Sequence, residues 1–387
     1  MEYTTIGESC SVVSGGTPSR TKNEYWIDGT IPWIKIGNIK SKYVNEYDEL
    51  ITEKGLNNSS AKLLEKGTIL YTIFATLGEV GILDIEACTN QAIAGITIND
   101  SRITTDYLYY YLKSKKDYVN NIGRGVAQNN INLTTLKKFE IPLIDINKQL
   151  KIVKALEKSE ELIALKKKEI DDLDLLIKAR FVEMFGNPVI NDKEWKQESL
   201  GRLATKIGSG ATPKGGKETY REDGIALIRS MNVHNGQFEY KDLAHISYEQ
   251  ASQLDNVTIE ENDILLNITG ASVARCCIAP ADILPARVNQ HVCIVRCKGS
   301  IMPNFLSFLL IDDNYQDLLW SIAGGGATRE AITKQQIENL QIILPPIELQ
   351  QQFADFAKQV DKSKLAVQQS LEKTQQLFDS LMQEYFG

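Results

Sequence analysis

Residues 14–18 read Ser-Gly-Gly-Thr-Pro, and residues 209–213, which lie 195 positions later, read Ser-Gly-Ala-Thr-Pro. Further short matches follow in the same order along both halves of the chain. They pair residues 6–7 with 200–201, 33–39 with 227–233, 90–91 with 289–290, and 123–125 with 324–326. Because this order is kept from end to end, the chain is a tandem duplication with a repeat of about 190–200 residues.

Each copy ends in a long stretch with apolar residues at intervals of seven. The first row is Leu156, Ile163, Ile170, Ile177 and Met184, and the second is Phe353, Val360, Val367 and Leu381, with Thr374 interrupting it. Each stretch runs for about 36 residues and predicts a helix with one apolar stripe. Two such stripes favour an antiparallel coiled-coil pair. The alternative is that each helix packs only on its own domain.

The earlier part of each copy has a different pattern. Short β-branched runs, such as residues 68–74 and 93–98, are separated by Gly, Asn and Asp and predict strands between loops. The predicted fold class is therefore α+β. Two similar α+β domains, at residues 1–146 and 187–346, are separated and joined by long antiparallel coiled-coil helices at residues 147–186 and 347–387.

Composition narrows the function. The 387 residues carry 43 Lys and Arg against 50 Asp and Glu, a net charge of −7, which excludes a small basic domain that coats nucleic acid by bulk charge. The N-terminus lacks a secretory signal pattern, and no apolar stretch approaches the roughly 20 residues of a membrane span. Six cysteines in a chain of this size do not suggest a disulfide framework. We expect a soluble, cytoplasmic protein with no membrane contact.

No convincing catalytic or metal-binding constellation is present. The run Gly324-Gly325-Gly326 lacks the Gly-Lys-Ser/Thr ending of a phosphate-binding loop. Cys276, Cys277, Cys293 and Cys297 lack a Cys-x-x-Cys zinc spacing. Three histidines offer little acid–base capacity near neutral pH. Asp192 with Glu194 and Lys196 is only weakly similar to the acidic and lysine pattern of a metal nuclease. We predict no catalytic residue, no metal and no cofactor.

The basic residues gather beside the repeated motifs. Residues 13–42 and 101–138 carry net charges of +3 and +5, whereas residues 43–100 carry −6. Lys and Arg can neutralise phosphates, while Asn, Gln and Arg can read base edges. Any single basic cluster could be plain solvated surface. The candidate DNA-binding residues are Thr17, Arg20, Lys22, Lys35, Asn38, Arg124, Gln128, Asn129, Thr212, Lys214, Lys217, Arg229, Asn232, Thr328 and Arg329.

The chain resembles the specificity subunit of a Type I restriction–modification enzyme. The resemblance rests on residues 14–20 and 31–39, on their second-copy partners at 209–213 and 227–233, and on the Ile/Leu-Pro segments that lead into each helix. It covers essentially the whole chain. Ala211 in place of Gly16 and Leu227 in place of Trp33 are modest departures.

The resemblance implies two target-recognition domains that each read half of a split, asymmetric site in double-stranded DNA, with the helix pair setting the gap. It also implies partners: two methyltransferase subunits that bring S-adenosylmethionine and methylate an adenine, and ATP-dependent motor and nuclease (restriction) subunits. This chain would then supply sequence specificity and no chemistry. Its acidic total predicts weak DNA binding alone and tight binding in the complex.

Three alternatives stay open. One is an enzyme, which rests only on the similarity of Asp192, Glu194 and Lys196 to a metal nuclease and would require metal-dependent cleavage by the isolated chain. The chain could be the specificity subunit of another methylation-based phage-defence system, which gene neighbourhood would distinguish. It could also be a coiled-coil adaptor whose domains bind proteins, which a salt-sensitive, sequence-dependent DNA complex would exclude.

Overall fold

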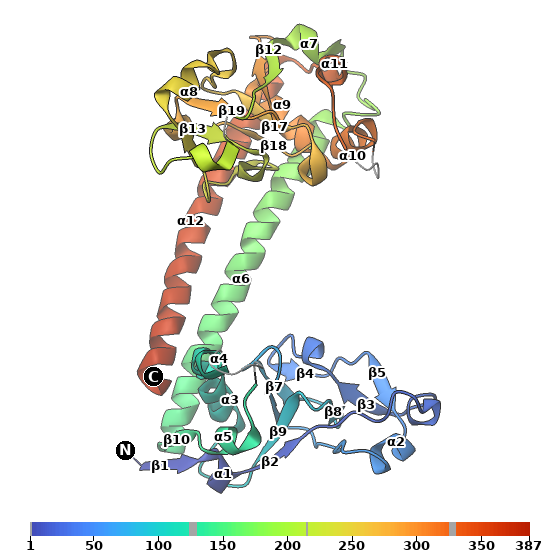
Figure 1. The fold of residues 1–387 in the computed structure, drawn as a ribbon, viewed down its shortest axis with the longest axis vertical. Helices are drawn as coiled ribbons and strands as arrows, with labels where there is room; N and C mark the ends of the chain where they lie inside the picture. Colours follow the sequence, from blue (N-terminus) through green and yellow to red (C-terminus); the bar gives the residue numbers. More distant parts are fainter. Residues whose placement is uncertain (1, 124–129, 214–215, 325–329) are drawn as a thin grey trace. The chain divides into compact units, whose positions relative to one another are not determined.

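The structure is a computed structural model that describes residues 2–123, 130–213, 216–324 and 330–387. It divides into two compact units, one formed by residues 1–167 and 369–387 and the other by residues 168–368. Each unit contains a mixed domain and one half of each of two long helices, α6 (Ile146–Phe185) and α12 (Ile347–Phe386) (Figure 1).

The strands of the first unit form three sheets in the described residues. The largest has the order β2-β9-β6-β7-β4, the next is β5-β3-β8, and β1 pairs with β10. Their bounds are β1 (Glu2–Thr5), β2 (Cys10–Ser14), β3 (Ile31–Ile34), β4 (Tyr43–Val44), β5 (Glu49–Ile51), β6 (Ile69–Thr72), β7 (Val80–Leu83), β8 (Cys88–Thr89), β9 (Ile93–Ile98) and β10 (Glu140–Leu143).

The helices of the first unit are short apart from α6. They are α1 (Ile6–Ser9), α2 (Glu53–Asn57), α3 (Thr105–Ser114), α4 (Lys116–Gly123) and α5 (Leu133–Lys137), with 3-10 turns η1 (Asn23–Tyr25) and η2 (Ile36–Asn38). Residues 107–112 of α3 are buried against the main sheet and α6, which explains the run of tyrosines there.

The second unit repeats this plan. Its described strands form sheets with the orders β12-β20-β17-β18, β16-β13-β19, β14-β15 and β11-β21. Their bounds are β11 (Gln197–Ser199), β12 (Ala204–Ser209), β13 (Ile225–Ile228), β14 (Val233–His234), β15 (Gln237–Phe238), β16 (Ala244–Ile246), β17 (Ile264–Asn267), β18 (Cys276–Ile278), β19 (Ala286–Val288), β20 (Val292–Cys297) and β21 (Gln341–Ile343).

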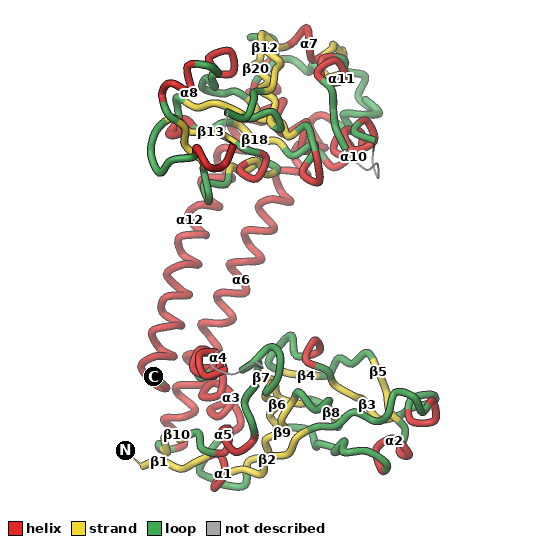
Figure 2. The backbone as a smooth tube through the Cα atoms, viewed as in Figure 1, coloured by secondary structure: helices red, strands yellow, loops and turns green. Residues whose placement is uncertain are grey.

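The helices of the second unit follow the same order as those of the first. They are α7 (Leu200–Leu203), α8 (Tyr248–Ser252), α9 (Pro303–Ile311), α10 (Asp313–Ile322) and α11 (Lys334–Glu338), with 3-10 turns η3 (Gly216–Thr219), η4 (Ser230–Asn232), η5 (Asp255–Val257), η6 (Gly270–Ser272) and η7 (Ala281–Ile283). Both units contain a matching parallel pair, β3 with β8 or β13 with β19, and in the first unit β4 also pairs with β7 in parallel. Figure 2 shows helix, strand and loop mixed in each domain, and the predicted α+β fold of two similar domains in tandem is confirmed.

The two long helices run antiparallel within each unit. In the first unit Lys166 donates to the Ser370 hydroxyl, and in the second unit the Lys364 ammonium lies 2.5 Å from an Asp174 carboxylate oxygen. The predicted seven-residue rows are buried or half-buried along their whole length, so they form the inner face of the pair. Because α12 begins in the second unit and ends in the first, the first unit combines two segments far apart in sequence, whereas the second is the continuous stretch of residues 168–368.

Aromatic side chains anchor the helices to the domains. In the second unit Phe181 and Phe185 of α6 pack against Phe305 of α9 and Phe353 of α12, with ring centroids 4.8–5.9 Å apart. In the first unit Phe386 of α12 packs against tyrosines of α3. The helices therefore belong to the domain cores, as well as to each other.

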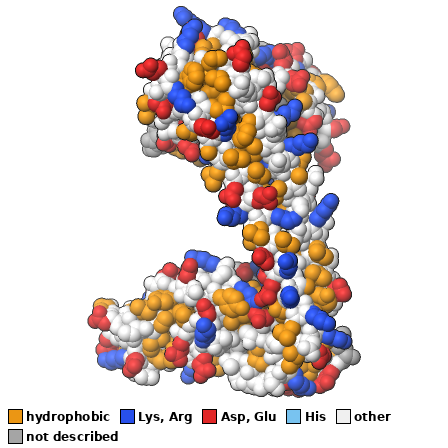
Figure 3. All heavy atoms as spheres, turned by 180° about the vertical axis from the view of Figure 1, so that it is seen from behind, with side chains coloured by type: hydrophobic (Ala, Val, Ile, Leu, Met, Phe, Trp, Pro, Cys, Tyr) orange, Lys and Arg blue, Asp and Glu red, His pale blue; other side chains and the backbone are white. Residues whose placement is uncertain are grey.

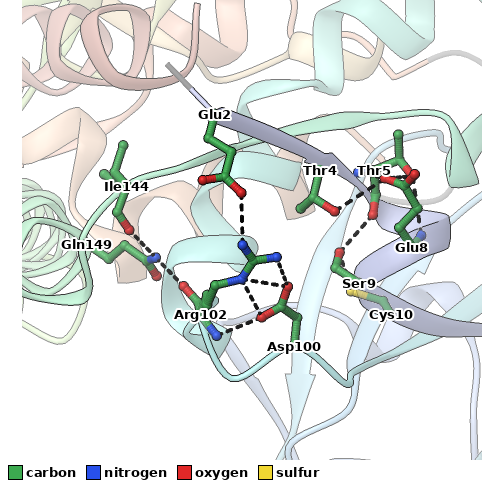
Figure 4. A network of polar contacts seen from close by, with 10 residues as sticks. All are labelled: Glu2, Thr4, Thr5, Glu8, Ser9, Cys10, Asp100, Arg102, Ile144 and Gln149. Atoms are coloured by element: carbon green, nitrogen blue, oxygen red, sulfur yellow. Dashed lines mark hydrogen bonds and ion pairs between the residues drawn. The ribbon is translucent and has the colours of Figure 1, made fainter.

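A polar network fastens the start of α6 to the first domain. Figure 4 shows the Arg102 guanidinium held by Asp100 at 2.8 Å and by Glu2 of β1 at 2.9 Å. The buried amide of Gln149 in α6 donates to the Arg102 and Ile144 carbonyls at 2.6 and 3.0 Å.

No helix in the described part of the chain is long and apolar enough to cross a membrane.

Candidate nucleic-acid interface

The two Ser-Gly-x-Thr-Pro turns dock on the two Asn-Gln segments. Thr17 donates to the Gln91 side-chain carbonyl, and Thr212 donates to that of Gln290. The glycine at the second motif position is required in both turns, because a Cβ at Gly15 would lie 2.2 Å from a backbone carbonyl oxygen, and one at Gly210 would lie 1.7 Å from another. The repeated motif thus builds the same local structure twice.

The departures of the second copy have a local cause. Gly16 lies against the backbone of residues 60–61, where a Cβ would approach within 2.3 Å, and its carbonyl accepts a 2.9 Å hydrogen bond from the Trp33 indole. Ala211 is exposed, and Leu227 occupies the position of the tryptophan. Glycine and tryptophan are needed together in the first domain and are lost together in the second.

The Lys/Arg-x-x-Asn segments form 3-10 turns closed by their asparagines. The Asn38 side-chain carbonyl accepts from the Lys35 backbone at 2.9 Å, and that of Asn232 accepts from the Arg229 backbone at 3.1 Å. The Asn232 amide also donates to the Glu239 carbonyl at 2.9 Å. Asn38 is 5% exposed and Asn232 is 0% exposed, so both side chains serve hydrogen bonds within the protein and not the surface.

Arg20 and Lys35 meet on one carboxylate. Both side chains bind Glu49, the lysine ammonium at 2.7 Å, and these hydrogen bonds, Arg20 first, lower the pKa of Glu49. The Arg20 guanidinium also stacks 3.6 Å from the centre of the Trp26 ring. Lys22 lies apart, with its ammonium donating to the Tyr25 hydroxyl at 3.0 Å.

Arg229 has a different setting from its first-domain counterpart. It donates to the Asp242 carbonyl and lies 5.3 Å from the centre of the Tyr220 ring, without the carboxylate that neutralises Lys35. The candidates Arg124, Gln128, Asn129, Lys214, Thr328 and Arg329, together with the Lys217 side chain, lie outside the described residues.

Three residues of the candidate site, Gln91, Gln290 and Glu49, were not among the residues predicted from the sequence. Gln91 and Gln290 were visible as a repeated pair, and the repetition was the signal for their role beneath the turns. Glu49 was counted within an acidic stretch, and only the pairing of β3 with β5 brings it beside Lys35. On the face drawn in Figure 3, Lys and Arg are interspersed with Asp and Glu.

Nothing in the described chain assembles a metal site, since no group of three or more His, Cys, Asp or Glu side chains comes together there. The cysteines considered for zinc lie within the strands and core. Burial raises the pKa of the Cys277 and Cys293 thiols to about 12, which leaves them protonated at neutral pH.

Comparison with known proteins identifies the family of this duplicated fold. The family model of the Type I restriction modification DNA specificity domain matches the chain twice, over residues 1–175 and 192–376. The Type I restriction enzyme MjaIX specificity subunit of Methanocaldococcus jannaschii is 28% identical over 406 residues, which cover 97% of this chain and 90% of that subunit.

Solved structures agree at the level of the fold. A structure from work on complex assembly and conformational transition of the type I R-M system covers 100% of this chain and 97% of its own, with a TM-score of 0.66 and 19% identity. The crystal structure of the S subunit from M. genitalium covers 100% and 96%, with a TM-score of 0.57 and 15% identity. The chain therefore belongs to the family of Type I restriction–modification specificity subunits.

Proposed function

We propose that this chain reads a bipartite, asymmetric site in double-stranded DNA, with residues 1–146 reading one half and residues 187–346 reading the other. The observation that carries the proposal is a shared scaffold with different donors. Both domains repeat the turn that docks on an Asn-Gln segment, yet the basic residue above it is Lys35, neutralised by Glu49, in one domain and Arg229 in the other. Two such readers would bind different sequences.

Among the described candidates, we assign three basic side chains to DNA. Arg20 is exposed and Lys35 and Arg229 are half-buried, and all three can donate to phosphates or base edges. The buried Asn38 and Asn232 instead use their side chains in hydrogen bonds within the protein. Thr17 and Thr212 position the turns beside them. The candidates outside the described residues stay predictions from their loop position and donor chemistry.

The chain is proposed to be non-catalytic. Methyltransferase subunits, two per complex, would bring S-adenosylmethionine and methylate an adenine taken out of the base stack. ATP-dependent motor and nuclease subunits would complete the restriction complex. The long helices are proposed to set the gap between the half-sites, as dimer geometry sets half-site spacing in other DNA-binding proteins.

Methylome sequencing tests this function directly. A host that expresses this chain with its cognate methyltransferase subunit should gain a bipartite methyladenine motif, and the motif should vanish when this chain alone is deleted. A motif that persists without the chain, or one with a single uninterrupted half-site, would contradict the proposal. Metal-dependent cleavage of DNA by the isolated chain would instead revive an enzymatic function.

A further inference from the structure

A hollow of about 490 Å³ that includes several polar side chains lies in the second domain, where the β17–β18 hairpin meets the start of β20. It is lined by Ser230, Met231, the turn Gly270–Ser272, Thr269, Arg275 and His291. Resting on the function above, we propose that this hollow recognises a guanine in the half-site read by the second domain, with Arg275 as the specificity-determining residue.

Arg275 is placed for such a contact by its hairpin. Its carbonyl accepts from the Asn267 backbone at 2.8 Å, and its own N–H donates to the Ser272 carbonyl at 3.3 Å. The side chain is half-buried, and among the described residues no hydrogen bond or ion pair joins the guanidinium to a partner. In contrast, Arg287 and Arg296 of the same domain are bound to Asp255 and Asp263.

A guanidinium beside this hollow that has no partner among the described residues favours guanine over the other bases. Its planar fork presents two parallel N–H donors, and guanine offers two matching acceptors, O6 and N7, on its major-groove edge. Adenine places an amino donor at the position of O6, so the fork would meet a donor there. Arginine to guanine is also the commonest specific contact in protein–DNA complexes.

A chain of hydrogen bonds fixes another part of the lining of the hollow. Thr212 donates to the Gln290 carbonyl, the Gln290 amide lies 3.0 Å from His291 Nε2, and His291 Nδ1 lies 2.6 Å from the Thr269 hydroxyl. Because an amide nitrogen only donates, His291 Nε2 accepts and the ring proton is on Nδ1. The Thr269 hydroxyl oxygen then accepts a hydrogen bond from the Nδ1–H group, and the hydroxyl hydrogen is available to an acceptor in the hollow.

The backbone identifies the equivalent place in the first domain. The bond from the Thr72 N–H to the Glu79 carbonyl, 3.0 Å, matches that from Asn267 to Arg275, so Glu79 stands where Arg275 does. The isolated bridges of Phe74 with Asn130 and of Thr269 with Ala331 match in the same way.

The third wall residue is matched by its neighbouring asparagine. The N–H groups of Ala92 and His291 bond to the side chains of Asn90 and Asn289 at 3.2 and 2.9 Å. Alanine therefore replaces the imidazole in the first domain.

The chemistry at this equivalent place is opposite. Glu79 is bound by Lys116 at 2.6 Å, Phe74 is 40% exposed, and Ala92 carries no donor. The first domain thus offers an apolar surface with a neutralised carboxylate, where the second offers a cation and hydroxyl and imidazole groups. Recognition by Arg275 is therefore confined to one half-site.

The experiment replaces Arg275 in the full chain assembled with its methyltransferase subunits and reads the methylated motif. Arg275→Ala should relax one G·C position of a single half-site, with about tenfold or greater loss of discrimination there and an unchanged second half-site. Arg275→Gln should shift that position toward adenine, whose N6 and N7 fit an amide. Arg202→Ala, an exposed arginine of the same domain outside the hollow, should leave every position unchanged.

Several outcomes would overturn the inference while leaving the proposed function standing. One is a wild-type bipartite motif that Arg275→Ala leaves intact, and another is relaxation at an A·T position. A uniform loss of binding with unchanged preferences would assign Arg275 to a phosphate. Should Arg275→Ala fail to assemble, Arg275→Lys keeps the charge without the fork and must relax the same position. If the wild-type complex has no bipartite motif, the proposed function itself fails.

Discussion

Glu49 holds two of the basic side chains that the first domain would offer to DNA. Arg20 and Lys35 both bind its carboxylate, and Lys35 is also 3.5 Å from Asp48. On the proposed function, a DNA phosphate would compete with Glu49 for these cations. The carboxylate would then limit non-specific attraction and keep both side chains oriented before DNA binds.

Replacing Glu49 should strengthen DNA binding. In the assembled complex Glu49→Gln should raise affinity for DNA about two- to fivefold at low salt, since exposed ion pairs are worth up to about 1 kcal/mol. The slope of log affinity against log salt should steepen by up to about 2, because two cations become free to release counterions. A salt titration of DNA binding measures both.

Glu46→Gln is the matched control for Glu49. It removes a carboxylate of the same domain whose pair with Lys40 is exposed and 3.6 Å long. Equal effects of the two substitutions would mean that net charge alone is responsible, and that Glu49 has no special hold on Arg20 and Lys35.

Asn232 should matter for stability. Its buried side chain accepts one hydrogen bond from the Arg229 N–H of its own turn and donates to the Glu239 and Lys241 carbonyls of the following segment, and Asn232→Ala leaves these partners unsatisfied, at a cost of about 1–3 kcal/mol. Urea unfolding of the full chain measures the loss. Met231→Ala, on the same turn but 44% exposed, should cost much less. A substitution at Asn232 without effect on unfolding would contradict the capping role.

At the scale of elements, each long helix carries a buried glutamine, Gln149 or Gln350, in its first turn. Gln149 accepts from the Thr104 N–H at 3.0 Å, and Gln350 accepts from the Met302 N–H at 2.9 Å. Both also donate to carbonyls of the segment that leads into their helix, Ile144 and Pro345. Sequence reasoning gave these glutamines no role, since a polar residue near a helix start reads as solvent-facing.

Removal of one glutamine tests this attachment. Gln350→Ala should lower the free energy of unfolding by about 1–3 kcal/mol, because the Met302 N–H and the Pro345 carbonyl lose their buried partner. Hydrogen exchange at Met302 should accelerate as well. Gln351→Ala, which removes only a surface contact with Asp355, is the control. Equal protection of the Met302 amide in both variants would argue against the attachment.

The elements themselves were largely accessible to sequence. The run predicted at residues 68–74 contains β6 (Ile69–Thr72), and the run at 93–98 is β9. The order of the strands in the sheet could not be predicted from the sequence. For example, β9 lies between β2 and β6, and very different lengths of chain separate it from these two strands. The local pattern of apolar and polar residues indicates which residues of a strand can be half-buried. The order of the strands depends instead on which faces of the sheet can be covered together.

For the whole molecule, the length of the helix pair should set the gap in the target. Lys166 pairs with Ser370, and Asp174 with Lys364, so removing residues 164–170 and 367–373 together takes one heptad from each helix in register. Seven residues shorten a helix by about 10 Å. The methylated motif should lose about three base pairs of spacer, at about 3.4 Å each, with both half-sites unchanged.

A heptad inserted at the same place is the counterpart of that deletion, and it should lengthen the spacer by the same amount. Methylome sequencing reads both variants. A deleted chain that assembles and still methylates the original spacing would contradict the role of the helices in setting the gap.

The sequence by itself determined the duplication, the α+β class, the two long helices and the family, because all of these follow from order, periodicity and motifs along the chain. Only the tertiary structure decided which candidates remain available. Asn38 and Asn232 are buried in their turns, Glu49 neutralises Arg20 and Lys35, and Arg275 comes beside His291 through strand pairing. Burial and charge pairing depend on which residues come into contact in the folded chain, and the pattern along the sequence does not show these contacts.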